Sequence, residues 1–548
     1  MVSYFVYASL NSDRATFKSS FDLLVNNTLS VFPLFSVVDN GAVGTKLFKH
    51  GYKLEHPVVL IPGFVSTGLE VWQQHELCSS TMHRTRVWGS ISMAKAFFTD
   101  FRCWFRHMSL NRSTGLDPEG IKVRPVDSFS GAAEFNEFYW LWNKIIDNLA
   151  KVGYDSNTIH MVTYDWRLSF VNLEIRDRLF TRLKTQVELM KLIHSKKVVF
   201  MSHSYGTQLL LYFLKWAESQ QGGKGGDSWV DTHVHAICNI AGSLLGVPKS
   251  FSAILSGEMK DTSQLGGTLN ELLEFWSVSS RKQRVDLFRT WHSLFTMLPI
   301  GGAEVWGDDG STPEEPSPQG ANRSNLFAPP LVNGLFAHVE ETCADANVNA
   351  ANLRNFLKNE LTGSGSMPLN MSFGYSKTPS ANDHNPLKWH NPLEVRLPYS
   401  PNLTIYSFYG VGKPTERGFR YRCNQKFKYS FVINTNYNED TWINGVRFSE
   451  GDGTVPLISL GYLSAKQWRT RSHNPAGSKI ITHEIAHNPH WISPRGGDFT
   501  GDHVDILGNY VLNEALVKIA CGSTVQQHFI SNIQSISEAV YDRLENSQ

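Results

Sequence analysis

The pentapeptide Ser202-His203-Ser204-Tyr205-Gly206 stands between an apolar, β-branched run and a stretch of helical composition. A strand that turns abruptly into a helix with serine at the tip is a nucleophile elbow, whose usual pattern is Gly-x-Ser-x-Gly. Ser202 replaces the first glycine here, and it is also small. The pattern predicts that Ser204 is a nucleophile. A serine-rich helix cap is the alternative interpretation.

A nucleophilic serine requires a histidine base and an acidic residue that orients this base. In this kind of site they follow in the order serine, acid, histidine. Asp452 in "EGDGTVPL" and His503 in "GDHVDIL" fit this order. The chain has 20 histidines and 50 acidic residues, so order alone does not select them. Asp502 and Asp505 stay open as alternative partners of His503.

Two backbone N–H groups are the candidates for stabilising a developing oxyanion. The first follows the nucleophile, at Tyr205, where a helix begins. The second is expected in the loop after an early strand. "LIPGF" supplies Gly63, which permits a close approach, and the N–H of Phe64. A simple strand-ending Pro-Gly turn is the alternative.

A zinc-protease pattern, His-Glu-x-x-His, occurs in "HEIAH" (483–487). The motif needs a helix to bring both imidazoles to one face. Pro489 follows closely, and it disfavours helical geometry for the preceding residue. None of the six cysteines forms a CxxC pair. We therefore expect no metal site.

Strands and helices alternate along the first half of the chain, which predicts βαβ units and a doubly wound, mostly parallel sheet. From about 243 to 400, Gly, Pro and Ser clusters break this pattern, which indicates an insertion, and a strand resumes at 402–412. The expected strands lie at 56–64, 160–167, 197–202 and 234–242, and the expected helices at 139–154, 173–194, 205–218 and 505–520.

The charge is balanced, with 51 Lys and Arg against 50 Asp and Glu, and a net charge of +1. This balance gives no support for nucleic-acid binding. No run approaches the roughly 18 apolar residues of a spanning helix. The first residues make a poor signal peptide because no basic segment precedes their apolar run. We therefore expect either a soluble chain or a missing N-terminal segment. Glycosylation triplets at Asn26, Asn111, Asn322, Asn370 and Asn402 weakly favour a secretory compartment.

From about residue 55 to 515, the chain closely resembles the phospholipid:diacylglycerol acyltransferases, in the lecithin:cholesterol acyltransferase-like branch of the α/β-hydrolases. The resemblance implies an α/β-hydrolase fold with Ser204 as nucleophile, Asp452 as acid and His503 as base. Phe64 and Tyr205 match the oxyanion positions, although Tyr205 replaces the usual methionine. The segments that carry the resemblance are HPVVLIPGFVSTGLEVW, RVWGS, TGLDPEGIKVRPV, YDWRLSF, SHSYG, LSGEMKDTSQL, EGDGTVPL and DHVDILGN.

The resemblance also implies a Cys78–Cys103 disulfide that closes a small membrane-contacting loop at 73–105, with Trp88 as an exposed aromatic of that loop. A Cys423–Cys521 bond is a further hypothesis. A mobile lid is expected at about 250–290. The resulting division is an N-terminal extension (1–55), a first core part (56–245), a lid or cap insertion (246–400) and a second core part (401–548).

The implied reaction moves a fatty-acyl group from a phospholipid, through acyl-Ser204, to diacylglycerol. It requires no cofactor and no metal, because the ester is itself the activated donor. The expected partners are phospholipid and diacylglycerol in a membrane, with no nucleic acid and no protein partner. The alternatives are a phospholipase A or lipase that uses water, transfer to a sterol, or a lipid-binding protein on a retired scaffold. The implied location is the endoplasmic reticulum membrane, with the catalytic domain in the lumen. The apolar segments at 272–276 and 294–302 suit either lipid contact or core packing.

Overall fold

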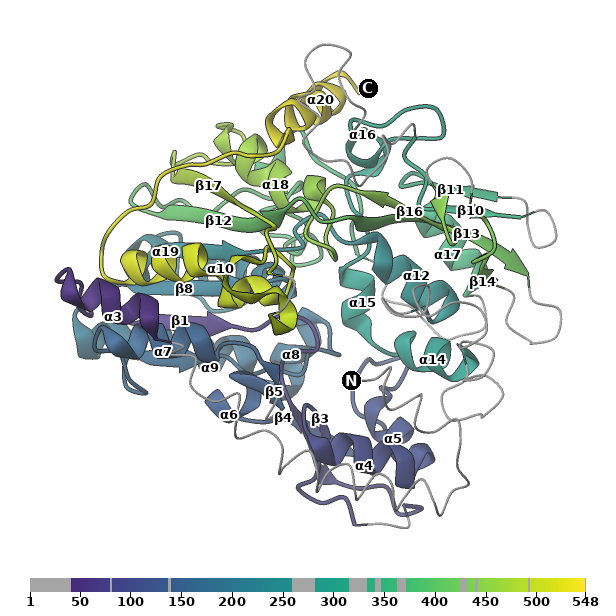
Figure 1. Cartoon of the computed structure of the whole chain (residues 1–548), viewed down its shortest axis with the longest axis horizontal. Coiled ribbons are helices and arrows are strands. Elements are labelled where there is room, and N and C mark those ends of the chain that lie inside the picture. Colours follow the sequence, from purple (N-terminus) through teal and green to yellow (C-terminus); the bar gives the residue numbers. More distant parts are fainter. Residues whose placement is uncertain are drawn as a thin grey trace.

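A computed structural model describes residues 41–78, 81–136, 139–258, 281–314, 333–340, 346–361, 371–423, 431–438, 442–490 and 493–547. Its centre is a six-stranded sheet in which every neighbouring pair is parallel (Figure 1). The spatial order is β17 (Lys479–Ala486), β12 (Thr404–Val411), β9 (Val234–Ile240), β8 (Val198–His203), β1 (Val58–Ile61) and β7 (Ile159–Met161).

Helices cover both faces of this sheet. One face packs against α3 (Ala42–Lys49), α7 (Asn143–Lys151) and α19 (Tyr510–Ala520). The other packs against α9 (Leu179–His194), α10 (Tyr205–Glu218) and α18 (Leu457–Ala465). Alternate residues of β1 belong to the two cores, and all four are fully buried. Burial on both faces explains why these strands read as unbroken apolar runs.

Three predicted helices are shorter or divided in the structure. The one expected at 505–520 begins only at Tyr510, after a 3-10 turn at Asp505–Gly508. The expected helix at 173–194 breaks at Arg178, whose φ of +52° separates α8 (Phe170–Asp177) from α9. The expected helix at 139–154 is only α7, because Tyr139–Trp140 form strand β6 against β5 (Glu134–Asn136).

A second, mostly antiparallel sheet lies beside the first. Its strands are β11 (Ala346–Val348), β10 (Ala337–Val339), β13 (Thr415–Cys423), β16 (Val446–Ser449) and β15 (Trp442–Ile443), with β14 (Phe431–Ile433) also pairing with β13. This sheet takes strands from both sides of the boundary expected at residue 400. The insertion over the core is therefore built from two separate stretches of chain.

The region expected to form a lid is only partly described. It includes α12 (Pro248–Ser256) and α14 (Arg281–Phe288), which lie with α15 (His292–Thr296) between the two sheets and the disulfide loop in Figure 1. The apolar segment 272–276 lies outside the described residues. Leu294 and Phe295 of the segment 294–302 are buried in the main core.

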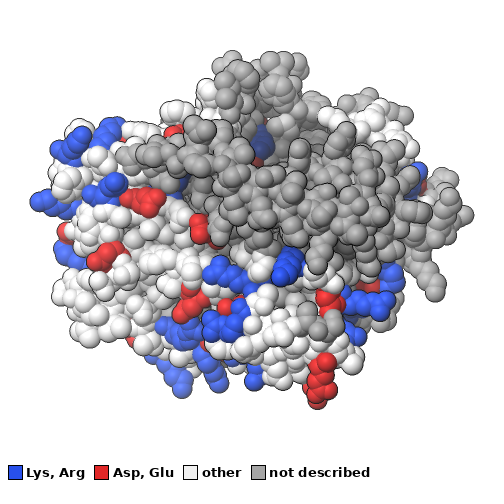
Figure 2. All heavy atoms as spheres, turned by 60° about the horizontal axis from the view of Figure 1, so that its bottom comes forward, with Lys and Arg blue, Asp and Glu red and all other residues white. Residues whose placement is uncertain are grey.

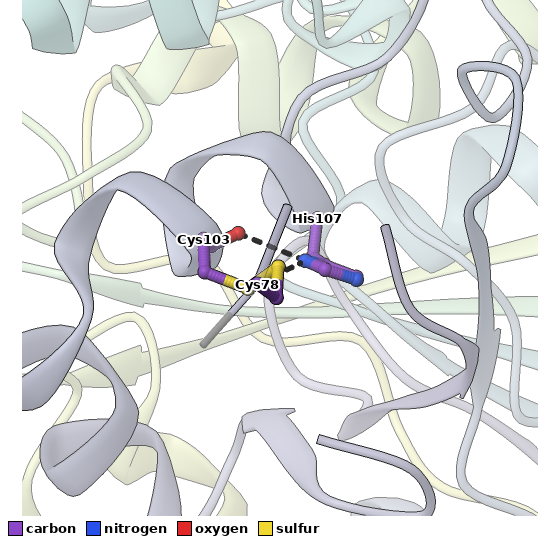
Figure 3. A group of neighbouring side chains, drawn as sticks. All are labelled: Cys78, Cys103 and His107. Atoms are coloured by element: carbon purple, nitrogen blue, oxygen red, sulfur yellow. Dashed lines mark hydrogen bonds between the residues drawn. A yellow bond between two sulfur atoms is a disulfide. The ribbon is translucent and has the colours of Figure 1, made fainter. Parts of the chain in front are cut away.

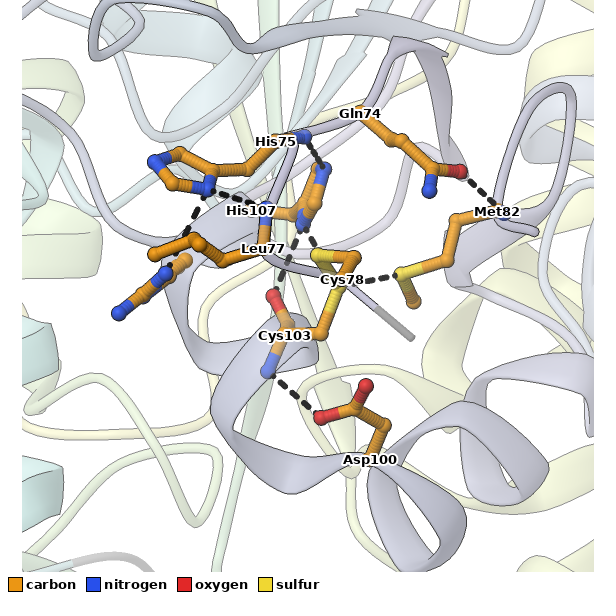
Figure 4. The surroundings of a disulfide bond; sticks show 9 residues. Gln74, His75, Leu77, Cys78, Met82, Asp100, Cys103 and His107 are labelled. Carbon is orange, nitrogen blue, oxygen red and sulfur yellow. Dashed lines mark hydrogen bonds between the residues drawn. A yellow bond between two sulfur atoms is a disulfide. The ribbon is translucent and has the colours of Figure 1, made fainter. Parts of the chain in front are cut away.

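A small sheet of β3 (Arg86–Trp88), β2 (Leu69–Gln73) and β4 (Lys122–Pro125) carries α4 (Ile91–Thr99) and α5 (Phe101–Met108). The Cys78–Cys103 disulfide joins α5 to the loop after β2, with the two Cα atoms 5.5 Å apart (Figure 4). The Asp100 carboxylate accepts the N–H of Cys103 and so caps α5.

The proposed Cys423–Cys521 bond is wrong. Cys521 carries a free thiol, and Cys423 takes part in a different disulfide. Cys521 follows the end of α19, whereas Cys423 ends β13 of the second sheet. The two residues belong to different layers of the fold, which spacing along the chain does not reveal.

The remaining described elements connect these layers. On the face shown in Figure 2, lysine and arginine side chains are interspersed with acidic ones over the described surface. No described helix combines the length and the apolar composition that a membrane crossing requires. The connecting elements are α6 (Phe129–Ala132), α11 (Trp229–His233), α16 (Gly302–Trp306), α17 (Leu353–Glu360) and α20 (Ile533–Asn546), with short 3-10 turns at Pro379–Asn382, Gln467–Arg469, Pro494–Phe499 and Asp505–Gly508.

Candidate active site

Ser204 occupies the turn between β8 and α10. Its φ of +55° and ψ of −125° are values that a residue with a side chain rarely adopts. The turn is tight because a Cβ added at Gly206 would lie 2.4 Å from the carbonyl oxygen of Pro62. Ser202 replaces the usual first glycine without a clash, and a 2.9 Å hydrogen bond joins its hydroxyl to that of Thr207. The local sequence thus produces the strained turn that presents Ser204.

The three predicted triad residues lie in one hydrogen-bonded line. His503 Nε2 lies 2.8 Å from Ser204 Oγ, and His503 Nδ1 lies 2.6 Å from Asp452 Oδ2. The Asp452 carboxylate is fully buried, and its Oδ1 accepts the backbone N–H groups of Thr454 and Val455. With both oxygens engaged, the carboxylate is held in one orientation towards the imidazole. The arrangement allows His503 to take the Ser204 proton.

The two alternative acids are engaged elsewhere. The Asp502 carboxylate forms an ion pair with Lys413, and its Oδ1 accepts the N–H of Val504. Asp505 forms an ion pair with Arg495. The tertiary structure therefore brings Asp452, 51 residues away along the chain, to His503 in place of its sequence neighbours.

His203 is a contact that sequence reasoning missed. Its Nε2 donates to the carbonyl of His503 at 2.8 Å, while the His503 N–H donates to the carbonyl of Asp452 at 2.9 Å. Burial and the neighbouring His503 lower the pKa of His203 to about 3, so this imidazole is neutral. The backbone of His503 is thus fastened to both of the other triad segments. A histidine inside the elbow, directly before the nucleophile, was the available signal.

The candidate oxyanion donors lie close to the nucleophile. A Cβ added at Gly63 would come within 3.0 Å of Ser204 Cβ, so the loop after β1 touches the elbow. Within the described part of the chain, no hydrogen bond engages the N–H of Phe64 or of Tyr205. Both donors are available for a substrate oxygen.

Aromatic rings surround this loop. The Phe64 ring packs edge-on against Trp166 at 5.1 Å and against Trp291 at 6.3 Å. The Tyr205 ring is fully buried and stacks on Phe170 at 5.3 Å. The exchange of methionine for Tyr205 therefore adds a ring to the core beneath the elbow and keeps the backbone N–H.

Trp88 is not the exposed aromatic that the resemblance implied. Its side chain is half-buried, its Nε1 donates to the carbonyl of Val65 at 2.8 Å, and its ring packs on Trp166 at 5.2 Å. Trp88 ends strand β3, whose pairing with β2 turns the indole towards the loop after β1. Among the described side chains of this region, the exposed large apolar ones are Leu77 and Trp72, which are 74% and 46% exposed.

The His-Glu-x-x-His segment is a strand. Residues 483–486 belong to β17, so the two imidazoles do not share a helical face. The Glu484 carboxylate accepts the Tyr409 hydroxyl and the N–H groups of Ile530 and Ser531, which fastens the C-terminal segment to the sheet. Glu484 is therefore structural.

Among the described residues, the one group with metal-ligand spacing is Cys78, Cys103 and His107 (Figure 3). The two sulfurs form the disulfide, so neither is a thiolate ligand. His107 Nδ1 donates to the carbonyl of Cys103 at 2.8 Å, and its Nε2 accepts the N–H of His75. Both ring nitrogens are occupied by the hydrogen bonds that hold this loop.

A serine at a strained strand-to-helix turn above a parallel sheet, joined to a histidine and an aspartate, is the arrangement of the α/β-hydrolase class. The family model described as "Lecithin:cholesterol acyltransferase" matches residues 82–510. Because this match covers well over half of its length, the chain belongs to that family.

Similar proteins include three named for one activity. The phospholipid:diacylglycerol acyltransferase of Schizosaccharomyces pombe is 41% identical over 90% of this chain and 77% of its own length. The protein of that name from Saccharomyces cerevisiae is 36% identical over 92% of this chain and 76% of its own length. Phospholipid:diacylglycerol acyltransferase 1 of Arabidopsis thaliana is 34% identical over 87% and 82%.

Proposed function

We propose that this chain is a serine-dependent acyltransferase that moves a fatty-acyl group from a phospholipid to diacylglycerol, giving lysophospholipid and triacylglycerol. The observation that carries the proposal is the line from Asp452 through His503 to Ser204, in a chain similar over most of its length to proteins named for that reaction.

The first half-reaction acylates Ser204. His503 takes the hydroxyl proton, and Ser204 Oγ attacks the carbonyl carbon of a phospholipid ester. The N–H groups of Phe64 and Tyr205 stabilise the oxyanion, and a single such donor contributes roughly 3–4 kcal/mol in known cases. His503 then gives the proton to the departing lysophospholipid oxygen as the ester bond breaks.

The second half-reaction transfers the acyl group from Ser204 to a second alcohol, diacylglycerol. His503 removes the proton from the free hydroxyl of diacylglycerol, whose oxygen attacks the acyl-Ser204 carbonyl. The intermediate collapses with return of the proton to Ser204, and triacylglycerol leaves. No cofactor or metal enters either half, because no step needs an electron acceptor or an external activator.

Water is the competing acceptor in the second half. Transfer therefore requires that the acyl-enzyme be shielded from bulk water. The buried triad and the aromatic rings of Phe64, Trp166 and Trp291 support this requirement. The ratio of transfer to hydrolysis is what separates the proposal from a phospholipase.

We also propose that the disulfide-closed loop contacts the membrane through Leu77, together with Trp72 of the adjoining strand β2, in place of Trp88. Beside Leu77, whose N–H donates to His75 Nδ1 (Figure 4), the Arg106 guanidinium also donates to that nitrogen at 3.4 Å and would meet lipid headgroups while the leucine side chain enters the interface. Among the described side chains of this loop, Leu77 is the most exposed large apolar one.

The Cys78–Cys103 disulfide supports a lumenal location, since such bonds persist in oxidising compartments. Asn111 and Asn402 are exposed and could carry glycans there, whereas the asparagines of the other three triplets lie outside the described residues. Peptide mapping of thiol-blocked protein, isolated without reductant, tests both points. A reduced Cys78 together with unmodified Asn111 and Asn402 would contradict a lumenal site.

The direct test supplies purified protein with acyl-labelled phospholipid, with and without diacylglycerol. Label is expected in triacylglycerol only when diacylglycerol is present and only when Ser204 is intact. Label confined to free fatty acid would indicate a phospholipase, and label in a sterol ester, when sterol is supplied, would indicate a different acceptor. A protein that binds phospholipid without turnover and is not labelled by a fluorophosphonate would be a binding protein.

A further inference from the structure

The loop from Pro62 to Thr67, called the oxyanion loop below, is held from outside by three side chains. The Tyr164 hydroxyl donates to the carbonyl of Pro62 at 2.8 Å. The Trp166 Nε1 donates to the carbonyl of Thr67 at 3.0 Å. The Trp88 Nε1 donates to the carbonyl of Val65 at 2.8 Å. Of the three carbonyl groups that accept these bonds, the one bound by Trp88 belongs to Val65, which directly follows Phe64 along the chain.

Val65 adopts a backbone conformation that is unfavourable for valine. Its φ of +58° lies in the left-handed region, which β-branched residues avoid. Such a conformation persists only where surrounding contacts determine it. The indole N–H of Trp88, on the Val65 carbonyl, is one of these contacts. The peptide that precedes Val65 carries the carbonyl of Phe64, so a rotation at Val65 would also disturb Phe64.

Trp88 reaches Phe64 by a second route, through the rings. The Trp88 ring packs on Trp166 at 5.2 Å, and Trp166 packs edge-on against Phe64 at 5.1 Å. Trp166 is fully buried, and the flanking Asp165–Arg167 ion pair, also fully buried, holds its backbone. Trp88 thus supports both the backbone and the side-chain environment of the oxyanion loop.

We propose that Trp88 is a positioning residue for acyl transfer, whose indole N–H holds the oxyanion loop in the conformation that aims the Phe64 N–H at the substrate carbonyl. The proposal rests on the proposed function, because it assumes that Phe64 is an oxyanion donor. It assigns Trp88 to catalysis and not to membrane binding. Trp88 belongs to β3, inside the disulfide-closed loop. Its hydrogen bond to Val65 therefore connects that loop directly to the oxyanion loop.

The test variant is Trp88→Phe, which keeps a ring and removes the N–H donor. The matched control is Trp229→Phe, because the Trp229 Nε1 also makes one hydrogen bond, to the Glu188 carboxylate at 2.8 Å, and Trp229 precedes β9, at the edge of the sheet opposite the oxyanion loop. Four quantities are measured: the rate constant of Ser204 labelling by a fluorophosphonate, kcat and KM for phospholipid vesicles with diacylglycerol, and vesicle binding by co-flotation. Thermal unfolding shows whether each variant is folded.

Trp88→Phe is expected to lower both the labelling rate constant and kcat about tenfold, the effect of one lost hydrogen bond. KM and vesicle binding are expected to stay within twofold, and Trp229→Phe is expected to leave the labelling rate unchanged. Unchanged labelling in Trp88→Phe would overturn the proposal, and so would reduced vesicle binding with normal labelling. No labelling of the unmodified protein would instead contradict the proposed function.

If Trp88→Phe also loses stability, a double-mutant cycle with Val65→Gly separates the effect of the lost hydrogen bond from the loss of stability. Glycine adopts positive φ without strain, so Val65→Gly should reduce the need for the indole bond. In the Val65→Gly background, the loss of labelling rate caused by Trp88→Phe is expected to shrink from about tenfold to less than threefold. Equal losses in both backgrounds would show that Trp88 does not act through Val65.

Discussion

Gly206 is the residue at which the elbow tolerates no side chain, because a Cβ there would overlap the carbonyl oxygens of Ile61 and Pro62. That contact pulls the start of α10 against the end of β1, and so places Ser204 next to the oxyanion loop. On the other side, the Asp452 carboxylate is fixed by the N–H groups of Thr454 and Val455. The position of Ser204 and the orientation of the Asp452 carboxylate thus each depend on contacts with only two backbone groups.

Asp452→Asn is expected to lower kcat by about 10⁴-fold, because the amide no longer stabilises the charged imidazole or its tautomer. Thermal unfolding should change little, since Asn is nearly isosteric. The control is Asp502→Asn, which alters the neighbour of His503 that pairs with Lys413. Its activity in the labelled-lipid assay should stay within a few-fold. A larger loss in Asp502→Asn than in Asp452→Asn would mean that the acid is misassigned.

At the scale of elements, the site is assembled at the carboxyl ends of parallel strands. Phe64 follows β1, Ser204 follows β8, and His503 lies beyond the end of β17. Parallel strands all end at one edge of the sheet, so residues from distant parts of the chain meet there. The small sheet with α4 and α5 extends from β1 on this side, which brings the disulfide-closed loop to the oxyanion loop.

Leu77→Asp is expected to weaken binding to phospholipid vesicles about tenfold or more, because an exposed leucine that enters a bilayer interface contributes roughly 1.5–3 kcal/mol. The control is Leu192→Asp on α9, a leucine of similar exposure at 77% on another helix layer. Co-flotation with vesicles measures binding, and hydrolysis of a water-soluble ester measures the intact site. Equal weakening by both substitutions would argue against a specific membrane-contacting loop.

Removal of the Cys78–Cys103 bond by a double Cys→Ser substitution is expected to destabilise the small sheet by about 2–4 kcal/mol, from the loop entropy released. The two cysteines are 25 residues apart, and Cys103 is buried beside Trp104. Hydrogen exchange of β2, β3 and α5 should increase more than that of the central sheet. Uniform exchange across both sheets would mean that the loop is held by packing alone.

At the scale of the whole molecule, several histidines are buried or half-buried, and this removal from water opposes their protonation. Burial lowers the pKa of His203 to about 3 and that of His235 to about 4, and it also lowers the pKa of His107 and His390. His235 stacks on His56 with ring centres 3.7 Å apart, which further opposes a charge. At these histidines the folded chain therefore binds fewer protons than the unfolded chain at mildly acidic pH.

Stability should fall as the pH drops from about 6.5 to about 4, because unfolded histidines take up protons near pH 6.5 while these folded ones do not. A fully buried histidine such as His203 steepens the loss by up to about 1.4 kcal/mol per pH unit in this window. Thermal unfolding midpoints between pH 7.5 and 4 measure the slope. His235→Gln should give a shallower slope, and an unchanged slope would show that the His56–His235 pair does not contribute.

From residue types and spacing alone, the chain determined its elbow, the order of nucleophile, acid and histidine, and a largely parallel sheet. These features are local, because a strained turn requires Gly206 and a doubly buried strand requires an apolar run. The tertiary structure decided what depends on long-range contact. It selected Asp452 over Asp502 and Asp505, separated Cys423 from Cys521, and divided the second sheet across residue 400. It also turned the indole of Trp88 inward to Val65. Strand pairing and packing set which distant atoms meet, and neither is written in the spacing of residues along the chain.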